Sequence, residues 1–161
     1  MQTPLERSRH RIVVIDDDPM MVELISTRLL VAGYQVAVAR SGYEGLSRLR
    51  ESRADALILD VNMPGLDGFG VLEHMRKHRL ATPTMMLTAR NQPADVQRAI
   101  ALGAKDFLTK PFDDQRLLAR VARLLRVSAE APVGDSASGR VPRASPQVST
   151  GPASSDRQSS S

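Results

Sequence analysis

A carboxylate stands directly after an apolar run, a position suited to chemistry. Asp60 follows residues 56–59, four hydrophobic side chains in a row, and precedes the turn-forming residues 62–65. Such a run is typical of a strand covered on both faces, as in parallel sheets. In open α/β sheets, ligands bind beyond the carboxyl ends of the strands. Asp60 is therefore a candidate reactive group, although a single Asp here also serves as an ordinary turn cap.

A group of acids follows the first apolar run of the chain. Asp16, Asp17 and Asp18 come directly after residues 12–15. If the two strands are neighbours, Asp16 and Asp17 approach Asp60, and three carboxylates at short range repel one another unless a cation is bound. Oxygen ligands with open positions for water favour Mg²⁺. Alternatively these acids only cap the next helix against its dipole, which we favour for Asp18.

A hydroxyl and an ammonium group follow two further apolar runs. Thr88 comes after residues 84–87, and Lys110 lies just beyond residues 106–108. Alone, a Thr here is usually a turn former and a Lys a solvated charge. Facing an acidic cluster together, Lys supplies a point charge and Thr a hydrogen bond to phosphoryl oxygens. With Mg²⁺ and an Asp nucleophile, they make up a phosphoryl-transfer site.

Five apolar runs alternate with helical patterns, and these elements must position the residues above. The expected strands are residues 12–15, 34–39, 56–59, 84–87 and 106–108. The expected helices begin near Pro19, the capping pair Ser41 and Glu44, Asp67, Pro93, and Asp113 or Asp114. Five β–α repeats predict an α/β fold, a doubly wound parallel sheet of five strands with helices on both faces.

Composition limits the class of protein. The 161 residues suffice for one domain with a proper core. The absence of cysteine excludes disulfides and thiolate metal sites. No apolar stretch reaches the roughly 18 residues of a membrane span, and residues 1–7 lack a secretory signal, so we expect a cytoplasmic protein. The net charge of +4 is mixed with acids over several helices, which favours surface solvation over direct nucleic-acid binding.

Composition changes sharply near Ser128. Residues 1–8 form an N-terminal arm and residues 9–128 the domain, while residues 129–161 are rich in Ser, Pro and Gly. The last segment has too few large apolar residues to offset its ordering entropy, so we expect a disordered tail or linker.

Several short motifs, in this order and spacing, resemble the receiver domain of two-component response regulators. They are Asp16-Asp17, residues 60–68, Thr88-Ala89 and Lys110-Pro111-Phe112, and the similarity covers roughly residues 9–127. The resemblance implies a flavodoxin-like strand order of 2-1-3-4-5. It also implies that Asp60 accepts a phosphoryl group from a phosphohistidine of a sensor histidine kinase or a phosphotransfer protein. Such a protein is a signalling switch and not a metabolic enzyme.

The resemblance further implies a set of metal ligands. Asp17 binds Mg²⁺ directly, and Asp16 contributes through water. Asp60 itself and the backbone carbonyl of Asn62 complete the protein ligands.

Four other positions take their roles from the same resemblance. Thr88 and Lys110 bind the phosphoryl oxygens. Phe107 occupies the aromatic switch position, where the ring turns inward as Thr88 moves toward the phosphate, and Ala89 leaves room for that movement. Phe107 is also compatible with a plain core role.

The output surface implied by the family comprises the helix that begins at Pro93, the strand of residues 106–108 and the last helix. One class of receivers pairs an acid and an arginine across a phosphorylation-dependent homodimer, at the positions of Asp106 and Arg120. Arg116 stands where that class usually has an acid, which counts against such a dimer here.

Three functions remain open from the sequence. We favour a stand-alone receiver that acts by protein contact, because the chain ends in low-complexity Ser. The alternative is the receiver part of a truncated transcriptional regulator. A remote third possibility is an aspartyl-phosphate hydrolase of small metabolites, which would need a second acid where Asn62 stands, and a cap domain.

Overall fold

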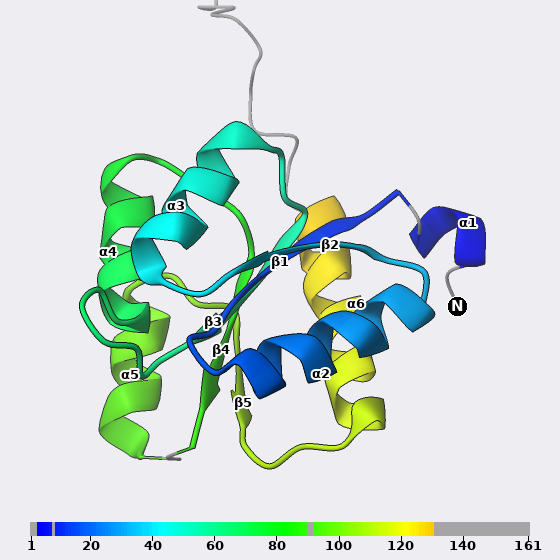
Figure 1. The fold of residues 1–161 in the computed structure, drawn as a ribbon. Coiled ribbons are helices and arrows are strands. Elements are labelled where there is room, and N and C mark those ends of the chain that lie inside the picture. The colour runs from blue at the N-terminus through cyan, green and yellow to red at the C-terminus, as the bar shows by residue number, and fades with distance from the viewer. Residues whose placement is uncertain (1–2, 8, 90–91, 131–161) are drawn as a thin grey trace, which may run out of the picture. The chain divides into compact units, whose positions relative to one another are not determined.

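The computed structural model describes residues 3–7, 9–89 and 92–130. Helices and strands alternate along the chain (Figure 1). Their bounds are α1 Pro4–Arg7, β1 Arg11–Ile15, α2 Pro19–Val31, β2 Gln35–Ala39, α3 Gly42–Glu51, β3 Ala56–Asp60, α4 Gly68–Lys77, β4 Thr84–Thr88, α5 Pro93–Ala101, β5 Asp106–Thr109 and α6 Asp114–Glu130.

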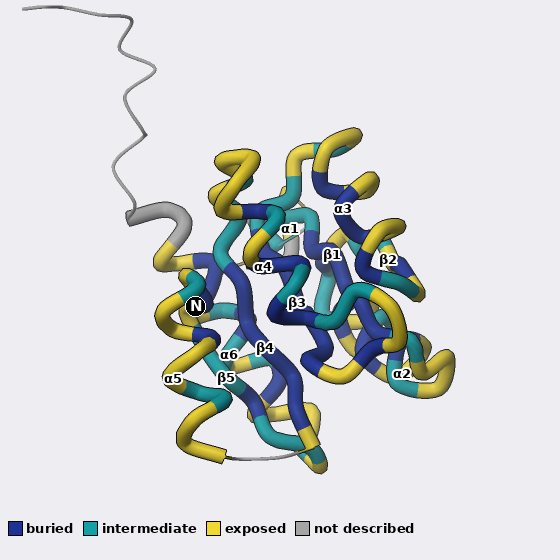
Figure 2. The backbone as a smooth tube through the Cα atoms, turned by 90° about the vertical axis from the view of Figure 1, so that its left-hand side faces the viewer, coloured by how far each residue is buried: buried dark blue, intermediate teal, exposed yellow. Residues whose placement is uncertain are grey.

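The five strands form one parallel sheet in the order β2-β1-β3-β4-β5. Every residue of the inner strands β3 and β4 is buried, as the continuous dark tube in Figure 2 makes visible. This arrangement confirms the predicted fold class and strand order.

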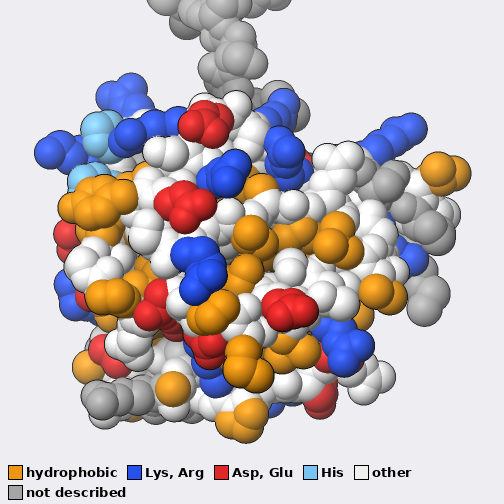
Figure 3. Space-filling view, viewed as in Figure 1, with side chains coloured by type: hydrophobic (Ala, Val, Ile, Leu, Met, Phe, Trp, Pro, Cys, Tyr) orange, Lys and Arg blue, Asp and Glu red, His pale blue; other side chains and the backbone are white. Residues whose placement is uncertain are grey.

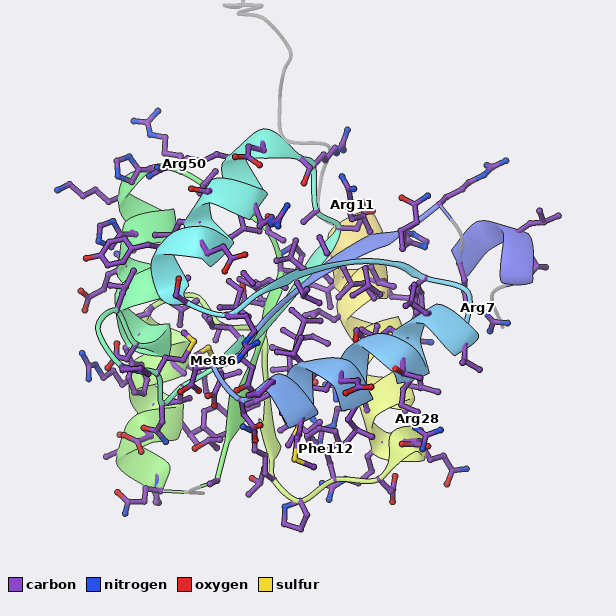
Figure 4. All side chains as sticks on the ribbon, viewed as in Figure 1. Arg7, Arg11, Arg28, Arg50, Met86 and Phe112 are labelled. Carbon is purple, nitrogen blue, oxygen red and sulfur yellow. The ribbon has the colours of Figure 1, made fainter. Side chains whose placement is uncertain are left out.

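Helices cover both faces of the sheet, and alternate strand residues serve the two layers. Ile15, Leu59 and Met86 pack toward α3, α4 and α5. Ile58 and Leu87 pack toward α2 and α6. Met86 and Phe112, labelled in Figure 4, belong to these two opposite layers. Both cores are mainly aliphatic, as the scarcity of aromatic residues requires.

Predicted caps begin four of the helices, since Asp67 accepts a hydrogen bond from the Gly70 amide before α4 and Asp113 accepts one from the Arg116 amide before α6. Asp18 accepts a hydrogen bond from the Met20 amide at 3.0 Å and starts α2. Ser41 accepts one from the Glu44 amide at 3.1 Å and starts α3. Because α2 to α6 return antiparallel to the strands, their N-termini lie at the carboxyl edge of the sheet and their C-termini at the amino edge.

A few boundaries differ from the prediction. Asp60 and Thr88 are the last residues of β3 and β4, so both lie inside the sheet's hydrogen-bonding range and not in the turns. The single turn of α1 was not predicted, because four residues are too short to show helical periodicity. Helix α6 continues to Glu130, two residues past Ser128. From residue 131 onward the predicted tail lies outside the described residues. No helix in the described part of the chain is long and apolar enough to cross a membrane.

Candidate functional site

Adjacent strands bring the predicted carboxylates together. Asp16 follows β1 and Asp60 ends β3, and these strands pair with Ile15 opposite Leu59. One carboxylate oxygen from each of Asp16, Asp17 and Asp60 lies within 4.8 Å of the others. The Asp18 amide donates to Asp16 Oδ1 at 3.0 Å, which holds the Asp16 side chain in place. The sequence-based grouping of these acids is therefore also a spatial one.

Burial makes this acidic cluster costly. Asp16 is 0% exposed and Asp60 is 4% exposed, while Asp17 is half-buried. Charged groups that leave water need compensating charges or hydrogen bonds. The cluster therefore requires a positive partner.

Lys110 supplies one such partner. Its Nζ lies 3.2 Å from Asp16 Oδ2 and 3.2 Å from Asp60 Oδ1. The sequence predicts Lys110 at this edge, but its bridge between the two acids was missed. The signal for the bridge was present, because like charges at neighbouring strand ends call for a cation between them.

The electrostatics of Asp60 and Lys110 are linked. Burial, together with the nearby Asp16 charge, raises the pKa of Asp60 to about 6, against the opposing pull of Lys110. Burial lowers the pKa of Lys110, but the carboxylates of Asp60 and Asp16 outweigh it and the net shift is upward. At neutral pH both groups are therefore mainly charged.

The residues present fit a hard divalent cation. Three carboxylates and one ammonium leave a local charge of about −2 when all are ionised, and that charge is largely buried. The donor set is oxygen only, which suits Mg²⁺ better than a transition metal. Asp16, Asp17 and Asp60 are the side chains that would hold it.

Thr88 lies at the same edge of the sheet. It ends β4 and is buried, and its carbonyl accepts a hydrogen bond from the Lys110 amide at 2.7 Å. This bond ties the end of β4 to the residue that bridges the acids. Ala89, directly after Thr88, is exposed.

Phe107 and Asn62 occupy different surroundings. Phe107 is half-buried on β5, opposite Met86 of β4, and packs against the core on the α3–α5 side. Asn62 is exposed in the turn after β3. The switch role of Phe107 and the ligand role of the Asn62 carbonyl stay predictions.

Asp106 and Arg120 contact each other within the single chain. Arg120 Nη1 lies 2.6 Å from Asp106 Oδ1, which also accepts the Phe107 amide at 2.8 Å. The resemblance implies that these two side chains pair across a homodimer. In the monomer they pair internally, so a cross-dimer pair would have to replace this contact.

The comparisons with known proteins agree with this geometry. The family model described as the response regulator receiver domain matches residues 12–122. The CpxR homolog of Haemophilus influenzae, a transcriptional regulatory protein, is 43% identical over 119 residues, which are 74% of this chain and 52% of that protein. The DNA-binding regulator RpaA of Synechocystis is 42% identical over 118 residues, 72% of this chain and 49% of that protein.

Solved structures give the same result for the fold. The chemotaxis protein CheY4 of Vibrio cholerae has a TM-score of 0.69 and 34% identity, covering 71% of this chain and 98% of that one. The present chain spans about half the length of the curated relatives it matches. Phosphorylation on Asp is the known function of the family, whose members signal and are not metabolic enzymes. By its matched sequence, its strand order and its acidic strand-end cluster, this chain belongs to the receiver domain family of two-component response regulators.

Proposed function

We propose that Asp60 is the phosphoacceptor of this receiver, and that the donor is a phosphohistidine of a sensor histidine kinase or a phosphotransfer protein. The observation that carries the proposal is the placement of a buried carboxylate 3.2 Å from Lys110 and beside Asp16 and Asp17. A charged nucleophile and a cation for the incoming phosphoryl oxygens thus lie next to each other at the carboxyl edge of the sheet.

Phosphoryl transfer to Asp60 forms one bond to phosphorus and breaks another. A carboxylate oxygen of Asp60 attacks phosphorus, and the bond between phosphorus and the donor's histidine nitrogen breaks. The electron pair of that bond stays on the nitrogen, and Asp60 becomes an acyl phosphate. When bound directly by Asp17, Asp60 and the Asn62 carbonyl, and through water by Asp16, Mg²⁺ would supply charge stabilisation for the phosphoryl oxygens.

Lys110 and Thr88 bind the phosphoryl group once it is attached. In the free protein Lys110 contacts Asp16 and Asp60, so phosphorylation would redirect its ammonium group toward the new oxygens. Ala89, the exposed residue directly after Thr88, has a small side chain. It therefore offers little steric resistance when the Thr88 hydroxyl moves toward the phosphoryl group. Phe107, half-buried on the neighbouring strand, is the ring that would turn inward.

The output surface is formed by α5, β5 and α6, as the family resemblance implies. We propose that, when phosphorylated, this receiver binds an unidentified output protein through this surface. A second candidate is the receiver module of a transcriptional regulator, favoured by the relatives that are about twice as long as the matched region. Sedimentation with and without beryllofluoride, a phosphoryl mimic, tests a third possibility, the homodimer through the same surface.

The deciding experiment is labelling with a small phosphodonor and Mg²⁺. We expect one phosphoryl group per chain in the unaltered protein and none in Asp60→Asn. Asp18→Asn is the matched control, because it removes an acid at the same edge while Asn keeps the helix cap. Labelling retained in Asp60→Asn would contradict the assignment, and sustained turnover of a phosphomonoester would support a hydrolase instead.

A further inference from the structure

A hollow lies at the amino edge of the sheet, away from the acidic cluster. Its volume is about 470 Å³, within the ordinary range of small-molecule sites. It opens between the C-terminal ends of α4 and α5, the start of β4 and the residue that precedes β5. Its lining includes four apolar residues and three basic ones: Leu72, Met75, Leu80, Leu102, Arg76, Arg79 and Lys105. We call it the amino-edge pocket.

The floor of the amino-edge pocket is apolar. Leu72 and Met75 of α4 are buried, and Leu80 and Leu102 are half-buried. A ligand with a hydrocarbon or aromatic body would cover the exposed parts of Leu80 and Leu102, which favours binding roughly in proportion to the apolar area removed from water.

The rim is cationic. Arg76, Arg79 and Lys105 line the pocket and are exposed. Among the residues that the structure describes, none of these three side chains forms an ion pair. Three unneutralised cations around an apolar floor favour a ligand with an anionic head, and arginine binds carboxylate or phosphate groups through two parallel hydrogen bonds.

The backbone of Arg79 marks the pocket independently. Helices α2, α4 and α5 end in the same type of turn. The residue in the left-handed position is Gly33 (φ 100°) after α2, Arg79 (φ 56°) after α4 and Gly103 (φ 101°) after α5. In each turn the amide of the next residue donates a hydrogen bond to a backbone carbonyl near the end of the helix. The pairs are Tyr34 to Leu29, Leu80 to Met75 and Ala104 to Ala99.

Glycine is the usual residue at this place, because a side chain is strained there. Arg79 is the one non-glycine residue with positive φ in the described chain. An arginine in this strained position that also lines a pocket points to a role for its side chain.

We propose that the amino-edge pocket binds a small amphipathic anion, an aryl or acyl carboxylate or phosphate whose apolar body packs against Leu80 and Leu102. Arg79 holds its anionic head, together with Arg76 and Lys105. The site is separate from the acidic cluster, because β4 runs from Thr84 at the pocket to Thr88 at that cluster, about 13 Å at the rise of a strand.

The test uses the full chain without Mg²⁺ or a phosphodonor, so its outcome does not depend on the proposed phosphorylation. Amide shifts in NMR spectra are followed during titration with 2-naphthoate, 2-naphthylphosphonate, neutral 2-naphthamide and inorganic phosphate. We expect one or both aromatic anions to shift residues 76–84 and 101–105. We expect the amide and inorganic phosphate to bind at least about tenfold more weakly, because the amide lacks the anionic head and inorganic phosphate lacks the apolar body.

Two variants separate binding from folding. Arg79→Gly should weaken the anions about tenfold while the melting temperature stays the same or rises, because glycine relieves the left-handed strain. Arg116→Gln, which removes one exposed charge at the opposite edge, should leave the affinity unchanged. The proposal is overturned if neither aromatic anion binds, if the shifts map elsewhere, if the neutral amide binds equally well, or if Arg79→Gly keeps the affinity.

Discussion

The two edges of one sheet carry opposite charges in opposite surroundings. At the carboxyl edge, Asp16 and Asp60 are buried and share one ammonium group. At the amino edge, Arg76, Arg79 and Lys105 are exposed and surround an apolar hollow. A buried acidic cluster and an exposed basic rim therefore lie at opposite edges of the same sheet.

Helix direction explains part of this separation. The last turns of α3 and α4 hold Arg48, Arg50, His74, Arg76 and Lys77, and basic residues at helix C-termini complement the dipole. In Figure 3, Lys and Arg side chains gather along the upper rim, with the histidines beside them, and Arg50 is labelled there in Figure 4. The fold therefore brings these basic residues of α3 and α4 together at the amino edge.

Burial decides which edge tolerates change. A buried charge that loses its partner is left uncompensated at a cost of several kcal/mol, whereas an exposed charge contributes little. The carboxyl edge should therefore respond strongly to single substitutions, and the amino edge weakly.

The largest effect is expected from removing Lys110. Lys110→Met should lower the free energy of unfolding by about 3 kcal/mol without Mg²⁺, because Asp16 and Asp60 lose their shared cation. The matched change at the other edge, Lys105→Met, should stay within about 0.5 kcal/mol, since Lys105 is exposed. Urea unfolding measures both, and equal losses would contradict the contrast between the edges.

Removing the charge of Asp60 should have the opposite sign. The pKa of Asp60 rises from 3.8 to about 6 on folding, so its ionisation costs stability as pH increases through that window. Asp60→Asn should be more stable than the unaltered protein by about 2–3 kcal/mol at pH 7.5 without Mg²⁺. The difference should shrink as pH falls through 6 toward 4, and a difference independent of pH would contradict this cause.

Mg²⁺ should stabilise the carboxyl edge by a smaller amount. At ten times its dissociation constant it should add about 1.4 kcal/mol to the free energy of unfolding, because it binds the folded chain. Asp17→Asn should weaken that affinity at least about tenfold, measured by calorimetry. An unchanged affinity would remove Asp17 from the ligand set, and Arg79→Gly serves as the control that should not alter it.

The smallest effect concerns the backbone at the amino edge. Arg79→Gly should raise the free energy of unfolding by up to about 1 kcal/mol, since the left-handed position suits glycine. The converse change, Gly103→Ala, should lower it by a similar amount, because Gly103 holds the equivalent place after α5 with φ 101°. Thermal unfolding compares the two, and a loss of stability in Arg79→Gly would show that its side chain holds the fold.

Much of the site could be predicted because it depends on local patterns. Asp60, Thr88 and Lys110 each follow an apolar run, and a parallel sheet brings the ends of such runs to one edge. The bridge from Lys110 to Asp16 was not predicted, because Mg²⁺ alone was expected as the cation between the acids and Lys110 was expected only at the phosphoryl oxygens. The amino-edge pocket was not predicted either, because its walls come from two helix ends, the start of one strand and the residue before another.

The sequence by itself determined the strands, the fold class and the family, since hydrophobic periodicity and motif spacing are carried by neighbouring residues. Only the tertiary structure decided which charges are buried, which are bridged and which stay exposed. Those properties depend on the strand order and on the packing of helices over each edge. For the same reason, Arg79 is an ordinary surface residue in the sequence and a strained lining residue of a pocket in the fold.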